Sequence, residues 1–171
     1  MNRKFAYAAL SAALIAGVAY AQEKSADVVG AKGDKIGTVA IKQGPHGSII
    51  TIALGKGALT PGVHGVHIHE HGDCSDYGQF TKSKGHINPR GKEHGFLNAK
   101  GPHPGDVPNI FAHADGSSQT EMLVYGVNLS GGKLDLIDED GSAIIIHASP
   151  DDHLSQPIGG AGARVACALI K

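Results

Sequence analysis

The sequence of 171 residues contains no tryptophan, and only 5% of its residues are aromatic. It has only two cysteines, which are too few for a zinc site built from thiolates. The 15 basic side chains are balanced by 16 acidic ones, and no basic stripe occurs, which excludes the charge pattern of a nucleic-acid-binding protein. No segment shows a sustained apolar period of about 3.6 residues, so the sequence predicts no amphipathic helix.

The longest apolar run stands at the N-terminus. Asn2-Arg3-Lys4 is basic, Phe5 to Val18 is uncharged and mostly apolar, and Ala19-Tyr20-Ala21 is a cleavage pattern. This order predicts a secretory signal peptide over residues 1–21 and one domain over residues 22–171. A membrane anchor is the alternative, but the run is short for a bilayer span of about 20 residues. The rest of the chain holds no run long and apolar enough to span a membrane.

The two cysteines, Cys74 and Cys167, lie far apart in the sequence. An even cysteine count in an exported chain favours a disulfide. Closing so long a loop would stabilise the fold by roughly 4–5 kcal/mol in the chain-entropy model. Two buried free thiols are the alternative.

Short β-branched runs alternate with clusters of the 25 glycines and 8 prolines. The runs cover residues 37–43, 48–54, 63–70, 121–129, 142–147 and 164–170. Strand-sized runs bounded by turn residues predict an all-β sandwich or barrel of antiparallel strands. Two long polar stretches, residues 72–118 and 148–163, are rich in glycine and proline and carry histidines, and we expect them to be loops that build a site.

Four histidines fall within the segment GVHGVHIHEHGDC, residues 62–74. His67 and His69 are two apart on a predicted strand, so their rings share one face and can bind one metal ion, while Ile68 points into the core. His71 has the same parity, but Gly72-Asp73 should bend the chain there. His64 has the opposite parity and should face elsewhere.

More potential metal ligands follow along the chain. They are His86, His94, His103, Asp106 and, at the end of the run AIIIH, His147. His103 and Asp106 are three residues apart in a Pro/Gly turn, close enough to share an ion. Imidazoles with one carboxylate suit zinc, copper, iron or nickel. The pattern therefore predicts a transition-metal site rather than unrelated surface histidines.

At this point the sequence resembles the copper/zinc superoxide dismutases of the bacterial exported kind. The matching motifs are GVHGVHIHEHGDC, GHINP, KEHG, GPHPGD, IIIH and GARVAC, in this order within residues 36–171. The resemblance implies an immunoglobulin-like Greek-key β-barrel or sandwich of about eight antiparallel strands with two site-forming loops. It also implies one copper and one zinc per chain, and dismutation of superoxide to O₂ and H₂O₂ in the periplasm, as an antioxidant defence.

The resemblance carries over residue by residue. It implies copper ligands His67, His69, His86 and His147, and zinc ligands His86, His94, His103 and Asp106, with His86 bridging the two ions and relaying a proton. Arg164 matches the arginine beside the copper, and Cys74 and Cys167 match the disulfide. Asp151 matches a carboxylate that links His67 to His94, although the adjacent Asp152 could take that role.

The remaining histidines match no metal position. His64 resembles a structural histidine hydrogen-bonded behind the site, His71 should be exposed, and His46, His113 and His153 are interpreted as surface residues. Lys82 and Lys84 are candidates for attracting the superoxide anion. The chain departs from the family in Ile87, where phenylalanine or a similar residue is usual, and in the loop SPDDHLSQP. These changes leave subunit contacts open, including a possible homodimer.

Two other classes remain as alternatives. The first is an exported copper- or zinc-binding protein without turnover, which would be expected to lack a ligand or Arg164. The second is a structural β-sandwich module, such as an adhesin, which would bind no stoichiometric metal.

Overall fold

The structure is a computed structural model that describes residues 22–132 and 134–171, so the predicted signal peptide lies outside the described residues. The described residues form nine strands and one short 3₁₀ helix. They are β1 (Glu23–Gly30), β2 (Lys35–Gly44), β3 (Gly47–Leu54), β4 (Gly62–His64), β5 (Val66–His69), η1 (Thr81–Ser83), β6 (Ile110–Ala112), β7 (Ser118–Tyr125), β8 (Ser142–His147) and β9 (Arg164–Ile170). Among these described residues, no helix is long and apolar enough to cross a membrane.

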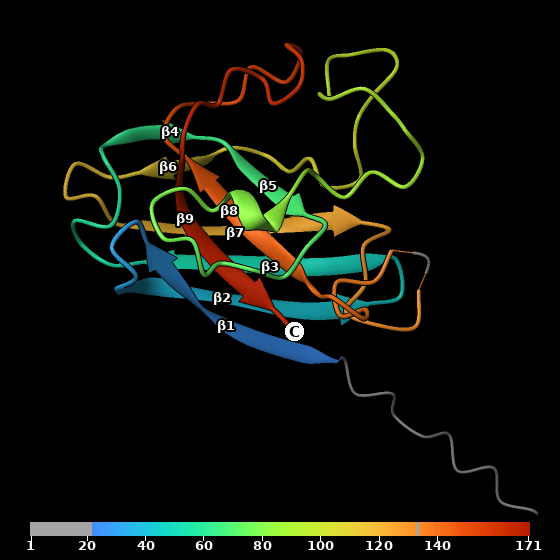
Figure 1. Ribbon diagram of the computed structural model, residues 1–171, viewed down its shortest axis with the longest axis horizontal. Helices are drawn as coiled ribbons and strands as arrows, with labels where there is room; N and C mark the ends of the chain where they lie inside the picture. Colours follow the sequence, from blue (N-terminus) through green and yellow to red (C-terminus); the bar gives the residue numbers. More distant parts are fainter. Residues whose placement is uncertain (1–21, 133) are drawn as a thin grey trace, which may run out of the picture.

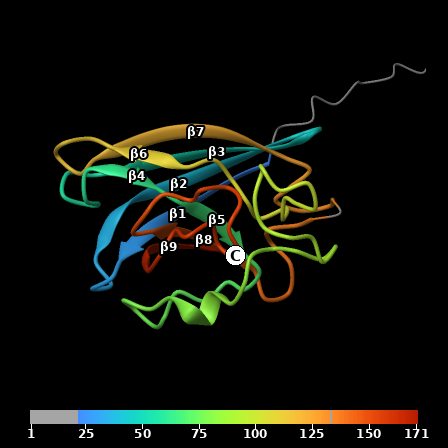
Figure 2. The ribbon, with the colours of Figure 1, turned by 90° about the horizontal axis from the view of Figure 1, so that it is seen from above.

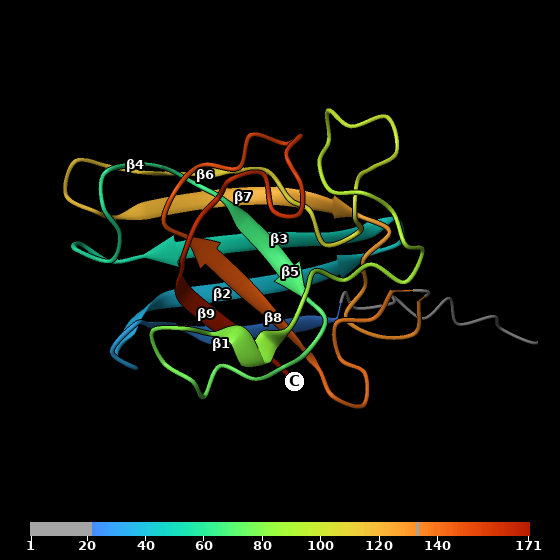
Figure 3. The same cartoon turned by 45° about the horizontal axis from the view of Figure 1, so that its top comes forward.

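Seven strands form one curled antiparallel sheet in the order β5-β8-β9-β1-β2-β3-β7, and β4 pairs with β6 in a second, small sheet. The curl brings β5, β8 and β9 across the face of β1, β2, β3 and β7 at a steep angle (Figures 1 and 3). β6 also lies next to β7, which places the small sheet beside the far edge of the large one. The all-β architecture with long-range strand order confirms the predicted fold class.

The main core fills the space between the crossing strands. Alternation on β2 and β3 turns Val39, Ile41, Ile50 and Ile52 inward, each at most 1% exposed. Burying side chains of this kind stabilises a fold by roughly 1.5–3 kcal/mol each. The core thus holds the strands that carry the histidines in fixed positions.

β8 is buried on both faces, which its sequence SAIIIH already suggests. Ile144 and Ile146 face the main core. Ala143 and Ile145 face a second cluster with Phe80 and the disulfide. Residues 72–84, including η1, therefore cover the outer face of β8, and Figure 2 shows this segment outside the sheet.

Cys74 and Cys167 form a disulfide, as predicted, with Cα atoms 5.9 Å apart. The bond fastens the covering segment to β9. It therefore anchors one end of the long loop that leads to His86.

The predicted strand boundaries need four corrections. β1 was missed because polar residues occupy four of its eight positions, and six of the eight residues stay exposed or partly exposed at the sheet surface. The run at 63–70 divides at Gly65 into β4, which pairs with β6, and β5, which pairs with β8. β6 lies inside the stretch taken as a loop, and the strand predicted at 121–129 instead covers Ser118–Tyr125.

Candidate metal centre

Three histidines lie on two paired strands. β5 pairs with β8 so that His67 lies opposite Ile145 and His69 opposite Ala143, and β8 ends at His147. All three histidines are at most 1% exposed. His67 Nδ1 lies 3.0 Å from His147 Nε2, and one ring nitrogen of each of the three falls within 4.8 Å of the others. The sheet thus brings together the three sequence-predicted copper residues that lie on strands.

Two buried nitrogens at this place have no hydrogen-bond partner among the described residues, His69 Nε2 and His86 Nε2. The opposite nitrogen of each ring is engaged: His69 Nδ1 donates to the Lys84 carbonyl at 2.8 Å, and His86 Nδ1 lies 2.9 Å from Asp106 Oδ1. A buried polar atom without a partner normally costs about 1–3 kcal/mol. Together with His67 Nδ1 and His147 Nε2, these atoms fit a copper ion held by four imidazoles.

The second group comes from the long loop between η1 and β6. His86 Nδ1 and His94 Nδ1 each lie 2.9 Å from Asp106 Oδ1, and His103 Nδ1 lies 3.1 Å from His86 Nδ1 and 3.4 Å from Asp106 Oδ1. Zinc bonds of about 2.0–2.1 Å in a tetrahedron imply ligand spacings of about 3.3 Å. Three imidazoles and one carboxylate at these spacings fit a structural zinc ion.

His67 also lies within 4.8 Å of the group formed by His86, His94 and Asp106. However, His67 Nε2 is already used, because it donates to Asp151 Oδ2 at 2.8 Å. His103 Nδ1 faces the other zinc-side atoms directly, while His103 Nε2 donates to the Lys92 carbonyl at 3.0 Å. The hydrogen bonds therefore favour His103 as the fourth member of this group.

Asp151 connects the two groups of histidines. One carboxylate oxygen accepts from His67 Nε2 at 2.8 Å and the other from His94 Nε2 at 3.0 Å, and Asp151 is 3% exposed. The neighbouring Asp152 is exposed and accepts from the backbone N–H groups of Leu154 and Ser155 instead. Asp151 thus takes the linking position that the sequence left open between the two acids. Such partners fix the tautomer and orientation of ligand rings.

The two groups differ in protonation. Burial, above all, lowers the pKa of His67 to about 4, with the Asp151 hydrogen bond opposing it, and burial lowers the pKa of His147 to about 3. Burial also opposes charge on His94, but its hydrogen bonds with Asp106 and Asp151 outweigh that effect and raise its pKa to about 9. The strand histidines are therefore neutral and ready to bind a metal, whereas His94 holds a proton.

The two carboxylates behave alike. Burial favours their neutral forms, but the hydrogen bonds from the histidines dominate. They hold the pKa of Asp106 and of Asp151 far below the usual range. Both groups are therefore anions that balance the positive charge of a bound metal.

Arg164 is half-buried at the start of β9. Its Nη1 donates to the Phe80 carbonyl at 2.7 Å and to Ser83 Oγ at 3.0 Å, and its Nη2 donates to the Lys84 carbonyl at 2.8 Å. Arg164 lies opposite His147 where β8 and β9 pair, and its Nη2 and His69 Nδ1 donate to the same Lys84 carbonyl, so the guanidinium stands near the strand histidines. Burial, and to a smaller extent this charge, lowers the pKa of His69 and of His147. Arg164 fastens the loop and supplies a fixed positive charge at once.

His64 occupies the place expected behind the site. It is 2% exposed, and its ring nitrogens lie 2.7 Å from the His147 carbonyl oxygen and 2.8 Å from that of Thr60. His46 and His113 are exposed, as expected. His71 is only partly exposed, because its Nδ1 donates to the Lys82 carbonyl at 2.8 Å.

The interpretation of His153 as a surface residue is wrong. Its ring is half-buried against Phe96, its Nε2 accepts from the Asn109 amide at 3.3 Å, and its Nδ1 lies 3.5 Å from Asp151 Oδ2. The loop after β8 folds back over the site. Sequence parity gives no information on a residue in such a loop.

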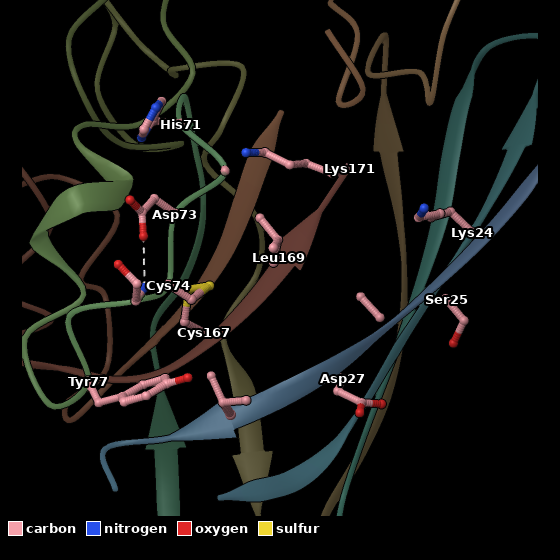
Figure 4. Close-up of a pocket in the computed structure, with 14 residues that line it drawn as sticks. Lys24, Ser25, Asp27, His71, Asp73, Cys74, Tyr77, Cys167, Leu169 and Lys171 are labelled. Atoms are coloured by element: carbon pink, nitrogen blue, oxygen red, sulfur yellow. Dashed lines mark hydrogen bonds between the residues drawn. A yellow bond between two sulfur atoms is a disulfide. The ribbon is translucent and has the colours of Figure 1, made fainter. Parts of the chain in front are cut away.

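A cavity of about 700 Å³ lies beside the disulfide rather than at the histidines. Figure 4 shows His71, Asp73, Leu169 and Lys171 around it, with the bond between Cys74 and Cys167 at its wall. None of the candidate metal ligands lines this cavity within the described residues. His103 instead lines a separate cavity of about 830 Å³, and His103 and Asp106 line one of about 360 Å³, so the zinc side of the candidate centre borders open space.

Comparison with known proteins agrees with this donor set. The family model described as copper/zinc superoxide dismutase matches residues 35–170. This chain belongs to that family. A relative named superoxide dismutase [Cu-Zn] from Caulobacter vibrioides is 47% identical over 142 residues, 81% of this chain and 80% of the relative. Superoxide dismutase [Cu-Zn] 1 from Aquifex aeolicus is 43% identical, covering 85% of this chain and 86% of the relative.

Solved structures show the same family likeness. The crystal structure of a SOD-like protein from Bacillus subtilis superposes with a TM-score of 0.81 at 39% identity, covering 86% of this chain and 97% of that one. The Cu/Zn superoxide dismutase from Brucella abortus gives a TM-score of 0.68 at 27% identity, covering 88% and 100%. The copper/zinc superoxide dismutase fold and the disulfide in this chain therefore agree with the sequence prediction.

Two side chains near the site were missed in the sequence. Asn109 pairs with the backbone of Asp151: its Oδ1 accepts from the Asp151 N–H at 3.0 Å and its Nδ2 donates to the Asp151 carbonyl at 2.8 Å. Gln156 makes the same kind of pair with the backbone of His94. Isolated amides in polar loops carry no pattern that could have indicated these contacts.

Proposed function

We propose that this chain dismutes superoxide to O₂ and H₂O₂ with one copper and one zinc ion. His67, His69, His86 and His147 would hold copper, and His86, His94, His103 and Asp106 would hold zinc. The observation that carries this proposal is the position of His86. Its Nδ1 lies among the zinc-side atoms, while its buried Nε2 faces no partner in the described part of the chain.

Copper, when bound, supplies one-electron redox chemistry, which zinc lacks. Two superoxide anions and two protons give one O₂ and one H₂O₂. Arg164 attracts and orients the anion, because its guanidinium keeps its charge and is fixed by three hydrogen bonds. His86 keeps Nδ1 on the zinc side, which leaves Nε2 as the atom that holds and gives up a proton.

The test measures copper and zinc in the purified mature protein by elemental analysis and superoxide removal in the same sample. We expect one copper and one zinc per chain with fast removal. Zinc alone, with no activity after copper loading, would contradict the proposal. His86→Ala should lose most of the activity, and full activity of this variant with both metals bound would reject the proton role of His86.

The second candidate function is metal binding without turnover, and the name of one relative favours it. A Bacillus subtilis relative, 39% identical over 145 residues, is named a superoxide dismutase-like protein. A metal-binding protein without turnover would give the same metal content but no superoxide removal. The complete set of buried donor atoms and the fixed Arg164 favour the enzyme.

We also propose that the chain is exported to the periplasm and that residues 1–21 are removed. The Cys74–Cys167 disulfide supports this proposal, because such bonds persist in oxidising compartments. N-terminal sequencing of protein recovered from the periplasm should begin at Gln22. Recovery of the protein only from the cytoplasm would contradict the proposal.

A homodimer is a further proposal, supported by exposed apolar side chains on the small sheet. Val63 on β4 lies opposite Phe111 on β6, and the two are 42% and 57% exposed. Leu123 and Tyr125 on the neighbouring β7 are also exposed. Light scattering should give twice the chain mass, and Phe111→Glu should shift the mass to that of a single chain.

A further inference from the structure

The backbone of His94 is held by a residue from the other long loop. The Gln156 side-chain oxygen accepts from the His94 N–H at 2.9 Å, and the Gln156 amide nitrogen donates to the His94 carbonyl at 2.8 Å. The same nitrogen also donates to the Leu154 carbonyl at 3.0 Å. One primary amide therefore bonds both backbone polar groups of His94, as a neighbouring strand would, and the His94 carbonyl also accepts from the Asn98 side-chain amide at 3.2 Å.

The turn that presents Gln156 is built by Asp152. Its Oδ1 accepts from the N–H groups of Leu154 and Ser155, both at 2.8 Å, and its Oδ2 accepts from the Ser155 hydroxyl at 2.6 Å. The Asp152 N–H donates to the Gly159 carbonyl at 2.9 Å. Because these hydrogen bonds hold the turn in one conformation, they also fix the position from which the Gln156 side chain reaches His94.

The two loops also meet backbone to backbone on either side of this amide. Leu97 N–H donates to the His153 carbonyl at 2.9 Å, and a side chain at Gly95 would collide with that carbonyl. A side chain at Gly159 would collide with the carboxylate of Asp151 where it accepts from His94. Gln156 makes its hydrogen bonds across this junction from a side chain that can be exchanged without altering the backbone.

We propose that Gln156 is a positioning residue that holds His94 in the zinc group and so sets the affinity of the protein for zinc. This inference rests on the assignment of His94, His103, His86 and Asp106 to zinc in the proposed function. His94 needs its ring nitrogens aimed at two places at once, at Asp106 through Nδ1 and at Asp151 through Nε2. A ring aimed in two directions tolerates little backbone movement, and Gln156 limits that movement.

The role of Gln156 can be separated from the stability of the fold. Gln156 is exposed, so its replacement removes hydrogen bonds and leaves the core intact. The copper-side residues His69 and His147 lie on β5 and β8. The described hydrogen bonds of Gln156 reach neither strand. Loss of the amide should therefore weaken zinc binding and leave copper binding and the stability of the metal-free protein unchanged.

The test uses the full mature chain with the substitutions Gln156→Met and Gln156→Glu. Methionine keeps the length of the side chain and removes both hydrogen bonds to His94 together with the one to Leu154, while glutamate keeps the acceptor for the His94 N–H but has no donor for the His94 carbonyl. Gln119→Met, at an exposed glutamine on β7, is the matched control. Metal-free protein is titrated with zinc against a chelator, and separately with cobalt(II), whose visible spectrum reports the geometry of the zinc group.

We expect Gln156→Met to weaken zinc binding about 10- to 100-fold, the usual effect of removing a partner that orients a ligand. Gln156→Glu should lose less, and the cobalt spectrum should change in both variants and not in Gln119→Met. Unchanged zinc affinity and an unchanged cobalt spectrum in Gln156→Met would overturn the proposal. An equal loss of zinc affinity, copper affinity and melting temperature would also overturn it, because it would show a general structural role.

These outcomes do not depend on catalysis. A wild-type chain that binds zinc but removes no superoxide would contradict the proposed enzyme function, while the affinity difference between Gln156→Met and Gln119→Met would still decide the role of Gln156. A wild-type chain that binds no zinc would overturn both proposals together.

Discussion

The two halves of the histidine centre are held by different kinds of structure. His67, His69 and His147 lie on β5 and β8, whose positions are fixed by sheet hydrogen bonds and a buried core. The zinc half, apart from the shared His86, comes from loop residues 94–106, and its His94 is oriented by the hydrogen bonds that it donates to Asp151 and Gln156. The sheet should therefore preform the copper half, whereas the zinc half depends on contacts between loops.

The electrostatics follow the same division. The copper half consists of neutral imidazoles whose pKa is lowered by burial. The zinc half includes Asp106, and its His94 has a pKa raised to about 9. The copper half therefore binds its metal without releasing protons from His67 and His147. The zinc half must release the proton of His94 when its metal binds.

The largest expected effect comes from removing a ligand of the copper half alone. His69→Ala should abolish copper binding and superoxide removal, because it deletes one of four buried donor nitrogens. Zinc binding should persist at one ion per chain, since His69 makes no contact with the zinc-side atoms among the described hydrogen bonds. Elemental analysis of the variant checks this, and loss of both metals would show that the halves do not form separately.

The second prediction is that the metal affinities of the two halves depend differently on pH. Zinc needs the deprotonated His94, and its pKa of about 9 in the metal-free chain lies above the ordinary value of 6.5. Zinc affinity should therefore rise about tenfold per pH unit between pH 6 and 8, with release of one proton from this residue. His67 and His147, with pKa values of about 4 and 3, add no such dependence for copper in that range.

Calorimetry in two buffers of different ionisation enthalpy measures both proton counts. A matched release of protons by the two metals would contradict the predicted difference. Metal-free protein with His94 replaced by alanine is the control for the zinc side.

Replacing Arg164 should slow the reaction with superoxide and leave copper binding unchanged. Arg164→Gln should lower kcat/KM about tenfold or more, since a local positive field raises the encounter rate of an anion by roughly 10- to 1000-fold. Metal content should stay at one copper and one zinc. Arg164→Lys keeps the charge and should retain more of the rate at low salt, which a purely loop-fastening role would not explain.

The smallest effect concerns the loop that joins the halves. Lys84 adopts φ 62° and ψ −140°, which is strained for a residue other than glycine, and its carbonyl accepts from both His69 and Arg164. Lys84→Gly should relieve strain and stabilise the fold by about 1 kcal/mol. Thermal unfolding measures this, with Lys82→Gly, which lies in η1, as the comparison.

The same variant tests the proposed attraction of substrate. If the ammonium of Lys84 helps to attract superoxide, Lys84→Gly should remove superoxide more slowly at low salt although it is more stable. An unchanged rate at low salt would assign Lys84 no part in attraction.

The sequence predicted much of the copper half because strand parity is a local property. The two-residue spacing of His67 and His69 places both rings on one face whatever the rest of the chain does. The loop residues His94, His103 and Asp106 could be proposed as ligand types from the residues alone, but only the resemblance to a family assigned all three to one zinc ion, since no periodicity relates them. The choice between Asp151 and Asp152 needed the three-dimensional path of the loop.

Other features had no sequence signal at all. β1 is a sheet strand with few buried side chains, so its alternation is weak. Gln156 and Asn109 act through hydrogen bonds to the backbone, and a lone amide in a polar loop looks like any exposed residue. His153 was misplaced for the same reason, because a loop that folds back over a site buries residues without regard to their polarity.

We propose that two different metals occupy two differently built halves that share His86. Anomalous diffraction from crystals of the mature protein, recorded at the copper and zinc absorption edges, tests it most directly. We expect copper among His67, His69, His86 and His147, and zinc among His86, His94, His103 and Asp106. Copper among the loop ligands, or zinc in the strand group of protein that is active and loaded with both metals, would contradict it.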